Sequence, residues 1–368
     1  MPDNKVIQYS QLQKDNAFAN NTFRKLQAQP SITLSENNTF RFSLPQTDYT
    51  SRVYLLIRGT FDLTHSSATT WNAVRHRKAP WNLIPKIKVD LNNGFAPFSV
   101  SAYENYLMNL CNPGNDYLRF DTTDLATNRN AVVLTDVAGS GGDSNTFQML
   151  IELPFQINRR DYVGLLNTQD PNLNVTVEIQ TGAAADMFTS TTGYTVATPS
   201  WTCTPFIEQF TVPANTLTGN PKEPLIDLST LKLVQSQTFT IAATGEYIVK
   251  LPIGQWYRRV ILDFHASETA LTNAQVTNFM MALNQSDTPI NLTSYQLSAF
   301  NHMQFGETAN VPAGAFVFDF SDQGFMNYGG SRDYINTNGL NEFWIKAQMA
   351  ATGTVTAIYE TLTKLKSA

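Results

Sequence analysis

The chain has 368 residues, of which 15% are charged, and its formal net charge at pH 7 is -5. A weakly acidic chain with so few charges lacks the basic surface that binds nucleic acid, which excludes nucleic acid as its principal partner. Asn, Thr, Ser and Gln are plentiful, so the surface is polar without being strongly charged. A chain of this length has room for two domains with ordinary cores.

Neither the cysteines nor the N-terminus carries a targeting or redox motif. Cys111 and Cys203 are far apart and form no CxxC pattern, so we expect two free, buried thiols and no disulfide framework. The first 29 residues contain no continuous apolar segment typical of a signal peptide. No apolar run approaches the roughly 20 residues that a membrane-spanning helix needs. We therefore expect a protein made in a cytoplasm that stays soluble or acts in something assembled there.

The N-terminal arm, residues 1–30, is predicted to be helical because residues 3–29 contain no Gly or Pro. Three- and four-residue spacings draw one imperfect stripe through Tyr9, Leu12, Asn16, Ala19, Phe23 and Leu26. The arm carries an excess of two positive charges, which favours an anionic surface slightly. Contact with lipid and packing against protein both stay open. The residues expected at this inner-face or intersubunit arm are Lys5, Ile7, Tyr9, Leu12, Lys14, Phe18, Phe23, Arg24, Lys25 and Leu26.

The segment from Leu34 to Ile57 is repeated without a gap 207 positions later. The matching pairs are Leu34 and Ile241, Phe40 and Tyr247, Phe42 and Val249, Leu44 and Leu251, Pro45 and Pro252, Tyr49 and Trp256, Arg52 and Arg259, Val53 and Val260, and Leu55 and Leu262. A period this long exceeds that of solenoid repeats and indicates a domain-sized unit present twice.

Each copy of the repeat predicts a strand, a corner and a second strand. Phe40, Phe42 and Leu44 alternate with polar residues, which places three large apolar groups on one strand face. The proline that follows, Pro45 or Pro252, removes a backbone donor and ends the strand. A short polar turn then leads into the second strand.

The remainder of the chain is also rich in short β-type segments, and helix is the minority state. Further strands are predicted within Ile84–Leu91, Phe98–Leu110 in part, Phe147–Phe155, Leu173–Ile179, Trp201–Val212, Thr277–Leu283, Ala315–Phe320, Glu342–Met349 and Thr354–Leu362. Turn-rich stretches separate them, a pattern typical of a sandwich or barrel. Several Pro, Gly and Asn residues mark 213–224 as a linker, which divides the chain into a first unit, 31–212, and a second unit, 225–368.

No constellation in the sequence points to catalysis, to a metal or to a cofactor. The four histidines form no zinc pattern, and no GxSxG nucleophile elbow occurs. The Gly-rich stretch 139–142 lacks the Lys of a phosphate-binding loop and is interpreted as a surface turn. Paired carboxylates for glycoside hydrolysis stay open, because a β-sandwich can supply them from distant strands.

One loop region is a candidate for contacts between subunits. It combines the densest basic cluster of the chain with loop-like aromatic residues, and aromatic side chains are enriched in subunit interfaces. A basic cluster of this size is also typical of a solvated loop. The candidate residues are Trp71, Arg75, Arg77, Lys78 and Trp81.

The segment Pro224-Leu-Ile-Asp-Leu-Ser-Thr-Leu231 resembles the entry to the second barrel of tectivirus major capsid proteins. Tectiviruses are tailless phages with a membrane inside an icosahedral shell. The order of parts is also similar: an N-terminal helix, a β unit, a linker, this octapeptide and a second β unit. The resemblance covers most of the chain in plan, but only the octapeptide closely.

The resemblance implies an all-β fold of two tandem jelly rolls, called a double jelly roll, with an N-terminal helical arm. Three subunits would present six barrels and form a pseudo-hexagonal homotrimer in the capsid shell of the virion. The resemblance implies no enzyme activity. It implies that the partners of each trimer are further trimers, penton proteins, minor capsid proteins and the internal membrane, which the arm would face. The alternatives are a carbohydrate-binding or carbohydrate-active tandem β-sandwich and a viral spike or receptor-binding protein.

Overall fold

The computed structural model describes residues 18–65, 74–92, 94–112, 120–121, 130–133, 143–157, 162–190, 194–197, 200–211, 228–305, 311–321 and 334–364. The elements up to residue 211 are β1 (Arg24–Ala28), β2 (Ile32–Leu34), β3 (Thr39–Ser43), β4 (Tyr49–His65), β5 (Val74–Arg75), η1 (Trp81–Leu83), β6 (Lys86–Leu91), β7 (Phe95–Val100), α2 (Ala102–Leu110), β8 (Phe120–Asp121), β9 (Asn130–Val133), β10 (Asp143–Pro154), β11 (Val175–Gln180), η3 (Ala184–Met187), β12 (Phe188–Ser190), β13 (Tyr194–Val196) and β14 (Ser200–Phe210). The later elements are β15 (Thr230–Ile241), β16 (Gly245–Lys250), β17 (Trp256–Ala266), β18 (Thr269–Ala270), β19 (Val276–Leu283), β20 (Asp287–Thr293), α3 (Ser294–Phe305), β21 (Ala315–Asp319), β22 (Ile335–Asn336), β23 (Phe343–Met349) and β24 (Gly353–Lys364).

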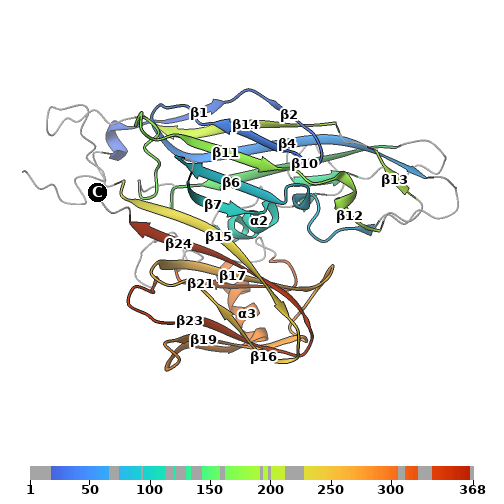
Figure 1. Cartoon of the computed structure of the whole chain (residues 1–368), viewed down its shortest axis with the longest axis vertical. Coiled ribbons are helices and arrows are strands. Elements are labelled where there is room, and N and C mark those ends of the chain that lie inside the picture. Colours follow the sequence, from blue (N-terminus) through green and yellow to red (C-terminus); the bar gives the residue numbers. More distant parts are fainter. Residues whose placement is uncertain are drawn as a thin grey trace, which may run out of the picture.

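The elements from β1 to β14 form a first unit, and those from β15 to β24 form a second unit stacked below it (Figure 1). In the first unit one sheet has the order β1-β14-β4-β10-β9-β8, and β2 also pairs with β14. The facing sheet has the order β3-β11-β6-β7. Along β6 the apolar residues Ile87, Val89 and Leu91 are buried while their neighbours are less so, because successive side chains point to opposite faces of a strand.

The second unit repeats this arrangement. Its upper sheet contains β15, β24 and β17, with β21 and β22 on the far side of β17, and its lower sheet has the order β16-β23-β19-β20. The core between them contains Phe279, Phe343, Ile345 and Val355, each fully buried. Two such sandwiches make the double jelly roll, so the predicted fold class is confirmed.

The repeat seen in the sequence is confirmed as a repeated corner. Leu44 directly follows β3 and its N–H donates to the carbonyl of Val175 at 2.9 Å, while Leu251 directly follows β16 and its N–H donates to the carbonyl of Phe343 at 3.0 Å. Both leucines are buried. The chain therefore turns from the lower sheet to the upper sheet in the same way in both units.

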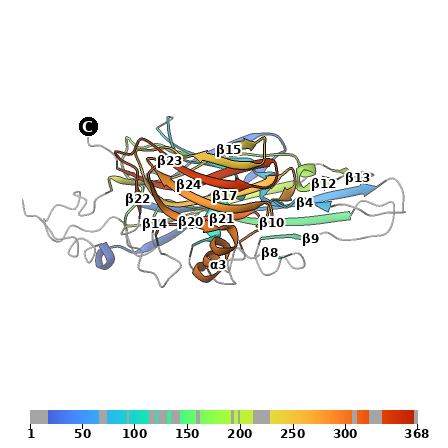
Figure 2. The same cartoon turned by 90° about the horizontal axis from the view of Figure 1, so that it is seen from below.

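The prediction of a strand across Phe98–Leu110 is wrong beyond β7, because the chain turns there into helix α2. Ser101 caps this helix: its hydroxyl accepts from the N–H of Glu104, whose carboxylate accepts from the N–H of Ser101. Thr293 and Gln296 cap α3 with the same pair of hydrogen bonds. Seen from below, α3 lies on the outside of the stacked sheets (Figure 2).

The helical prediction for residues 3–29 is wrong at β1 and untested before residue 18. Residues 18–21 are helical, but Arg24–Ala28 pair in antiparallel fashion with β14. Backbone pairing to the sheet edge overrides helix propensity here, since propensity is a weak prior that tertiary contacts outweigh. Within the described residues, the helices are too short or too polar to cross a bilayer.

Candidate functional site: the seam between the two units

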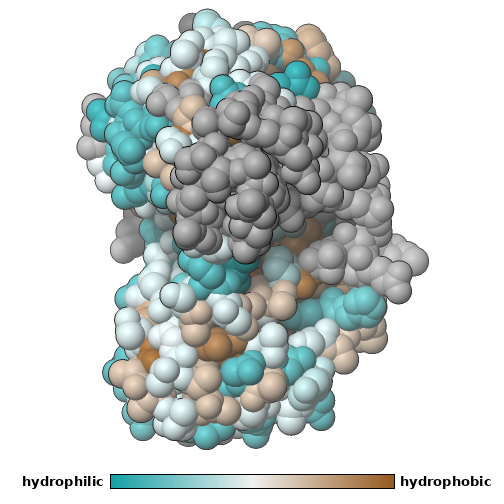
Figure 3. All heavy atoms as spheres, turned by 90° about the vertical axis from the view of Figure 1, so that its right-hand side faces the viewer, coloured by the Kyte–Doolittle hydropathy of each residue, from teal (hydrophilic) through white to brown (hydrophobic). Residues whose placement is uncertain are grey.

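The two units are joined by hydrogen bonds into one continuous sheet. Strand β15 of the second unit pairs in parallel with β7 of the first, with Val234 opposite Phe98 and Gln235 opposite Ser99. Val234 and Phe98 are buried, and the ammonium group of Lys232 lies 5.9 Å from the centre of the Phe98 ring. The space-filling view shows the two units as two lobes one above the other (Figure 3). The seam between them is therefore part of the folded core of the chain.

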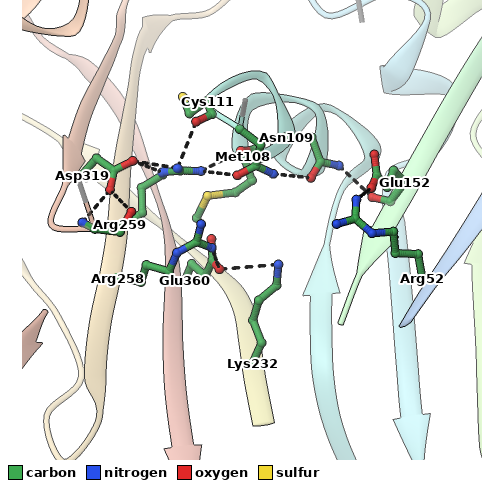
Figure 4. Close-up of polar contacts among 12 residues, drawn as sticks. Arg52, Met108, Asn109, Cys111, Glu152, Lys232, Arg258, Arg259, Asp319 and Glu360 are labelled. Atoms are coloured by element: carbon green, nitrogen blue, oxygen red, sulfur yellow. Dashed lines mark hydrogen bonds and ion pairs between the residues drawn. The ribbon is translucent and has the colours of Figure 1, made fainter. Parts of the chain in front are cut away.

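Glu360 on β24 is the centre of a buried charge cluster at this seam (Figure 4). It forms an ion pair with Arg258, and the Nζ atom of Lys232 lies 3.5 Å from its Oε1. Burial acts to raise the pKa of Glu360, but the cations Arg258, Lys232 and Arg259 outweigh it and lower the pKa to about 2. Burial has the larger effect on Lys232 and lowers its pKa to about 8, although Glu360 opposes it.

Arg259 on β17 connects the second unit to helix α2 of the first. Its guanidinium donates to Asp319 at 2.7 and 2.9 Å, and to the carbonyls of Met108 and Cys111 at 3.0 Å each (Figure 4). It also donates to Oδ1 of Asn112 at 3.0 Å. These acceptors include carbonyls at the end of α2 that have no partner within the helix. Only the planar fork of an arginine reaches acceptors in so many directions.

In the first unit, Arg52 and Glu152 form a second buried ion pair. The backbone carbonyl of Glu152 accepts from the side-chain amides of Asn105 and Asn109 at 2.8 and 2.7 Å, which fixes α2 against β10. In the second unit the amide of Asn301 donates in the same way to the carbonyl of Val317 at 2.8 Å, fixing α3 against β21. Thus Arg52 is paired with Glu152, and α2 and α3 are each fixed to a neighbouring strand by asparagine side chains.

A second polar contact crosses the seam near η1. Arg77 donates to both carboxylate oxygens of Asp263 at 3.1 and 2.7 Å, and Lys78 lies 3.9 Å from the same carboxylate. Asp263 is 1% exposed, so this bidentate pair is well shielded from water. His76 contacts Glu268 in the turn after β17. The basic segment 76–78 of the first unit therefore binds the second unit through Asp263 and Glu268.

The structure describes only some of the loop residues that were predicted to contact another subunit, and these lie in different surroundings. Trp71 and the side chain of Arg75 lie outside the described residues. For Trp81 the expectation is wrong, because the ring is buried in its own unit and stacks on Tyr106 with centroids 3.8 Å apart. Arg77 and Lys78 bind the second unit of their own chain, and any contact with another subunit stays a prediction.

The arm residues are also divided. Phe18 is buried against Tyr162 and Phe210, so it packs on the first unit. Phe23 and Leu26 are 64% and 54% exposed.

The two described cations of the arm are paired within the chain. Lys25 pairs with Asp48 at 2.9 Å, and Arg24 lies 3.9 Å from Glu208. Lys5, Ile7, Tyr9, Leu12 and Lys14 lie outside the described residues, so their contact with lipid or protein stays a prediction.

The described residues offer no obvious chemistry at the seam. No group of three or more His, Cys, Asp or Glu side chains among them could hold a metal ion. Burial raises the pKa of both thiols, Cys111 and Cys203, to about 12, which leaves them protonated and poorly nucleophilic. The geometry is that of a joint between two structural units.

Sequence reasoning aligned Arg52 with Arg259 but gave neither a function, and it missed Lys232, Asp319 and Glu360. The available signal was a charged residue inside a segment that otherwise reads as strand. Charged residues are almost never fully buried unless they are paired. The partners, however, lie on other strands and could not be identified from spacing.

Comparisons with known proteins agree with this architecture. The family model described as "Viral coat protein P2 N-terminal domain" matches residues 232–361, which is most of the second unit. No curated protein matches the chain in sequence.

Three solved structures show the fold over nearly the whole chain. The major capsid protein of STIV has a TM-score of 0.66 at 14% identity, covering 93% of this chain and 97% of that one. The major capsid protein P2 of bacteriophage PM2 has a TM-score of 0.56 at 13% identity, covering 94% and 98%. The PBCV-1 virus capsid protein has a TM-score of 0.62 at 9% identity, covering 93% and 94%. The chain is therefore a double jelly-roll protein, with the fold of these viral capsid proteins.

Proposed function

We propose that this chain is the major capsid protein of an icosahedral virus and that three copies form one tile of its shell. The observation that carries the proposal is the double jelly roll itself, which accounts for more than nine-tenths of this chain and of each of the three capsid proteins. The coat-protein family match in the second unit supports it independently. The function lies in surfaces, and we propose no enzyme activity.

The seam gives this proposal a physical basis. A shell tile must keep its two sandwiches in one fixed relation, and a shared sheet with buried ion pairs does so more firmly than a flexible linker. Three chains with two similar units each would present six similar units, which suits packing on a hexagonal lattice. Neither a carbohydrate-active protein nor a spike protein gains support from the comparisons.

The first test is the mass of the purified protein in solution. We expect a stable homotrimer with a mass of three times 41.0 kDa, measured by size-exclusion chromatography with light scattering. A chain that stays monomeric at every concentration, or that cannot be found in virus particles, would contradict the proposal.

Finer assignments are proposals supported by fewer observations. The octapeptide at 224–231 supports a tectivirus-like phage with an internal membrane, shells assembled in the host cytoplasm, and penton and minor capsid proteins as further partners. Only its last residues, from Leu228, are among the described ones. The same resemblance supports contact of the arm with the membrane, whereas its excess positive charges, Arg24 and Lys25, pair with Glu208 and Asp48 of the chain.

For the arm we expect the full chain, but not a chain lacking residues 1–17, to float with anionic lipid vesicles in a density gradient. Apolar side chains such as Ile7, Tyr9 and Leu12 on many copies can add up to stable membrane binding even when one arm binds weakly. Equal flotation of both chains would contradict membrane contact by the arm. Trimers that fall apart on the same deletion would instead identify the arm as a clamp between subunits.

A further inference from the structure

The strand registers make the two units comparable residue by residue. Arg52 on β4 is opposite Glu208 on β14, and Arg259 on β17 is opposite Glu360 on β24. On the next strand, Leu26 of β1 is opposite Glu208 and Val234 of β15 is opposite Glu360. Leu26 therefore occupies in the first unit the position that Val234 occupies in the second.

The lower sheets can be compared in the same way. Phe42 on β3 is opposite Val177 on β11, which is opposite Val89 on β6, which in turn is opposite Phe98 on β7. In the second unit, Val249 is the repeat partner of Phe42. It is opposite Ile345 on β23, which is opposite Met281 on β19, which in turn is opposite Ile290 on β20. Ile290 is therefore the equivalent of Phe98.

The helices follow these strands in equivalent positions, since their caps and buried anchors correspond. Ser101 and Thr293 are 192 positions apart, as are Asn109 and Asn301. By the same spacing, Phe300 and Met303 of α3 correspond to Met108 of α2 and to Cys111, the residue that directly follows it.

Equivalent residues differ sharply in burial. Met108 and Cys111 are 3% and 2% exposed because the second unit covers the end of α2, where Arg259 binds their carbonyls. Phe300 and Met303 are 43% and 60% exposed. Tyr103 of α2 is covered differently, by Trp81 of the η1 segment, so the comparison rests on the end of the helix. The second unit thus presents an apolar surface that the first unit buries.

A matching surface lies at the other end of the molecule. Among the strands that the structure describes, β1 is the edge of the upper sheet of the first unit; Leu26 on it is 54% exposed, whereas Val234 at the equivalent position is 2% exposed. Strand β20 is the edge of the lower sheet of the second unit within the described residues. In Figure 1, β1 lies at the top of the stack and the lower sheet of the second unit lies at the bottom. Head-to-tail contact between two copies would cover both surfaces.

We propose that β20, together with Phe300 and Met303 of α3, in one subunit binds the β1 edge of a second copy, repeating between chains the contact that β7 and α2 make with β15 within the chain. The register follows: β20 pairs in parallel with β1, with Ile290 opposite Leu26, as Phe98 is opposite Val234. Edge strands with free backbone groups pair readily with another chain. Such a heterologous contact closes into a ring when the rotation between neighbours permits. The inference rests on the proposed function and names its subunit interface.

A cysteine pair tests this register. Leu26→Cys combined with Ile290→Cys is expected to give, under mild oxidation, covalent trimers on a non-reducing gel, because residues opposite each other on paired strands lie within disulfide reach. The native thiols Cys111 and Cys203 are buried and do not compete. The matched control is Leu26→Cys with Ile253→Cys, since Ile253 is an exposed apolar residue at 43% outside the proposed surface. This control is expected to stay unlinked.

Substitution of the helix gives a second measurement. Met303→Asp is expected to weaken trimer formation at least roughly tenfold in light scattering, as expected for an apolar anchor in an interface. Ile253→Asp is expected to leave it unchanged. A wild-type trimer with neither crosslinking of the Leu26 and Ile290 pair nor sensitivity to Met303→Asp would overturn the interface and leave the capsid function intact. A wild-type chain that is always monomeric would overturn both.

Discussion

Glu360→Gln is expected to lower the free energy of unfolding by about 3–5 kcal/mol, because it removes the carboxylate at the centre of a buried ion cluster. The amide matches the carboxylate in size, so packing is kept while the charge is lost. Arg258 and Lys232 then remain buried at the seam without the ion pair that each forms with Glu360. For units of this size the melting temperature should fall by roughly 10 °C. Scanning calorimetry of both proteins at pH 7 measures the difference.

The difference between the wild type and Glu360→Gln is expected to depend on pH. The folded chain lowers the pKa of Glu360 to about 2 from its ordinary value of 4.5, since the neighbouring cations outweigh the effect of burial. A carboxylate with a lowered pKa stabilises the folded state fully above the unfolded pKa of 4.5, and this contribution is lost as the pH falls through about 2. The two melting temperatures should therefore converge on acidification.

The control is an ion pair of the same chemistry at the surface. Arg41 and Glu178 lie 2.7 Å apart, but the arginine side chain is 68% exposed. Glu178→Gln is expected to change the free energy of unfolding by less than about 1 kcal/mol, because water and side-chain entropy offset most of such a pair. Equal effects of the two substitutions would show that burial of Glu360 contributes nothing.

The sequence pattern predicted the corners of the fold because both copies of the repeat keep one spacing there. Phe42 and Val249 are 207 positions apart, whereas Asn109 and Asn301 are 192 apart. Connections of different length separate the elements, so a gapless comparison ends after β4 and β17. The equivalence of α2 and α3 is recorded in hydrogen bonds to β10 and β21, which spacing does not reveal.

The seam could be predicted only in part, for a physical reason. Alternation along a strand shows that one face is apolar, but whether a charge on the other face meets water depends on what lies over that face. Lys232 and Glu360 lie on the faces that the two units turn toward each other, and their burial follows from the stacking of the units. Helix α2 was missed although its start carries the Ser101 and Glu104 capping signal, because the polar residues Asn105 and Asn109 are among its buried residues and interrupt the apolar face.

Arg259→Met is expected to uncouple the two units. The substitution leaves Asp319 buried without its counter-ion and removes the donors to the carbonyls of Met108 and Cys111. The loss should be about 3–5 kcal/mol, since a buried charge stays unpaired. Because these bonds join β17 to α2, the loss falls on the contact between units. Calorimetry should show one transition for the wild type and two resolved transitions for the variant.

Two further variants separate uncoupling from general destabilisation. Arg52→Met removes the repeat-equivalent arginine, whose partner Glu152 lies in the same unit, so it is expected to lower the melting temperature within a single transition. Adding Asp319→Asn to Arg259→Met removes the buried carboxylate that has lost Arg259, and it should restore part of the stability. It cannot restore the bonds to α2, so the two transitions should persist. If the double variant instead regained a single transition, the carboxylate would be the cause, and the bridge from β17 to α2 would not be what couples the units.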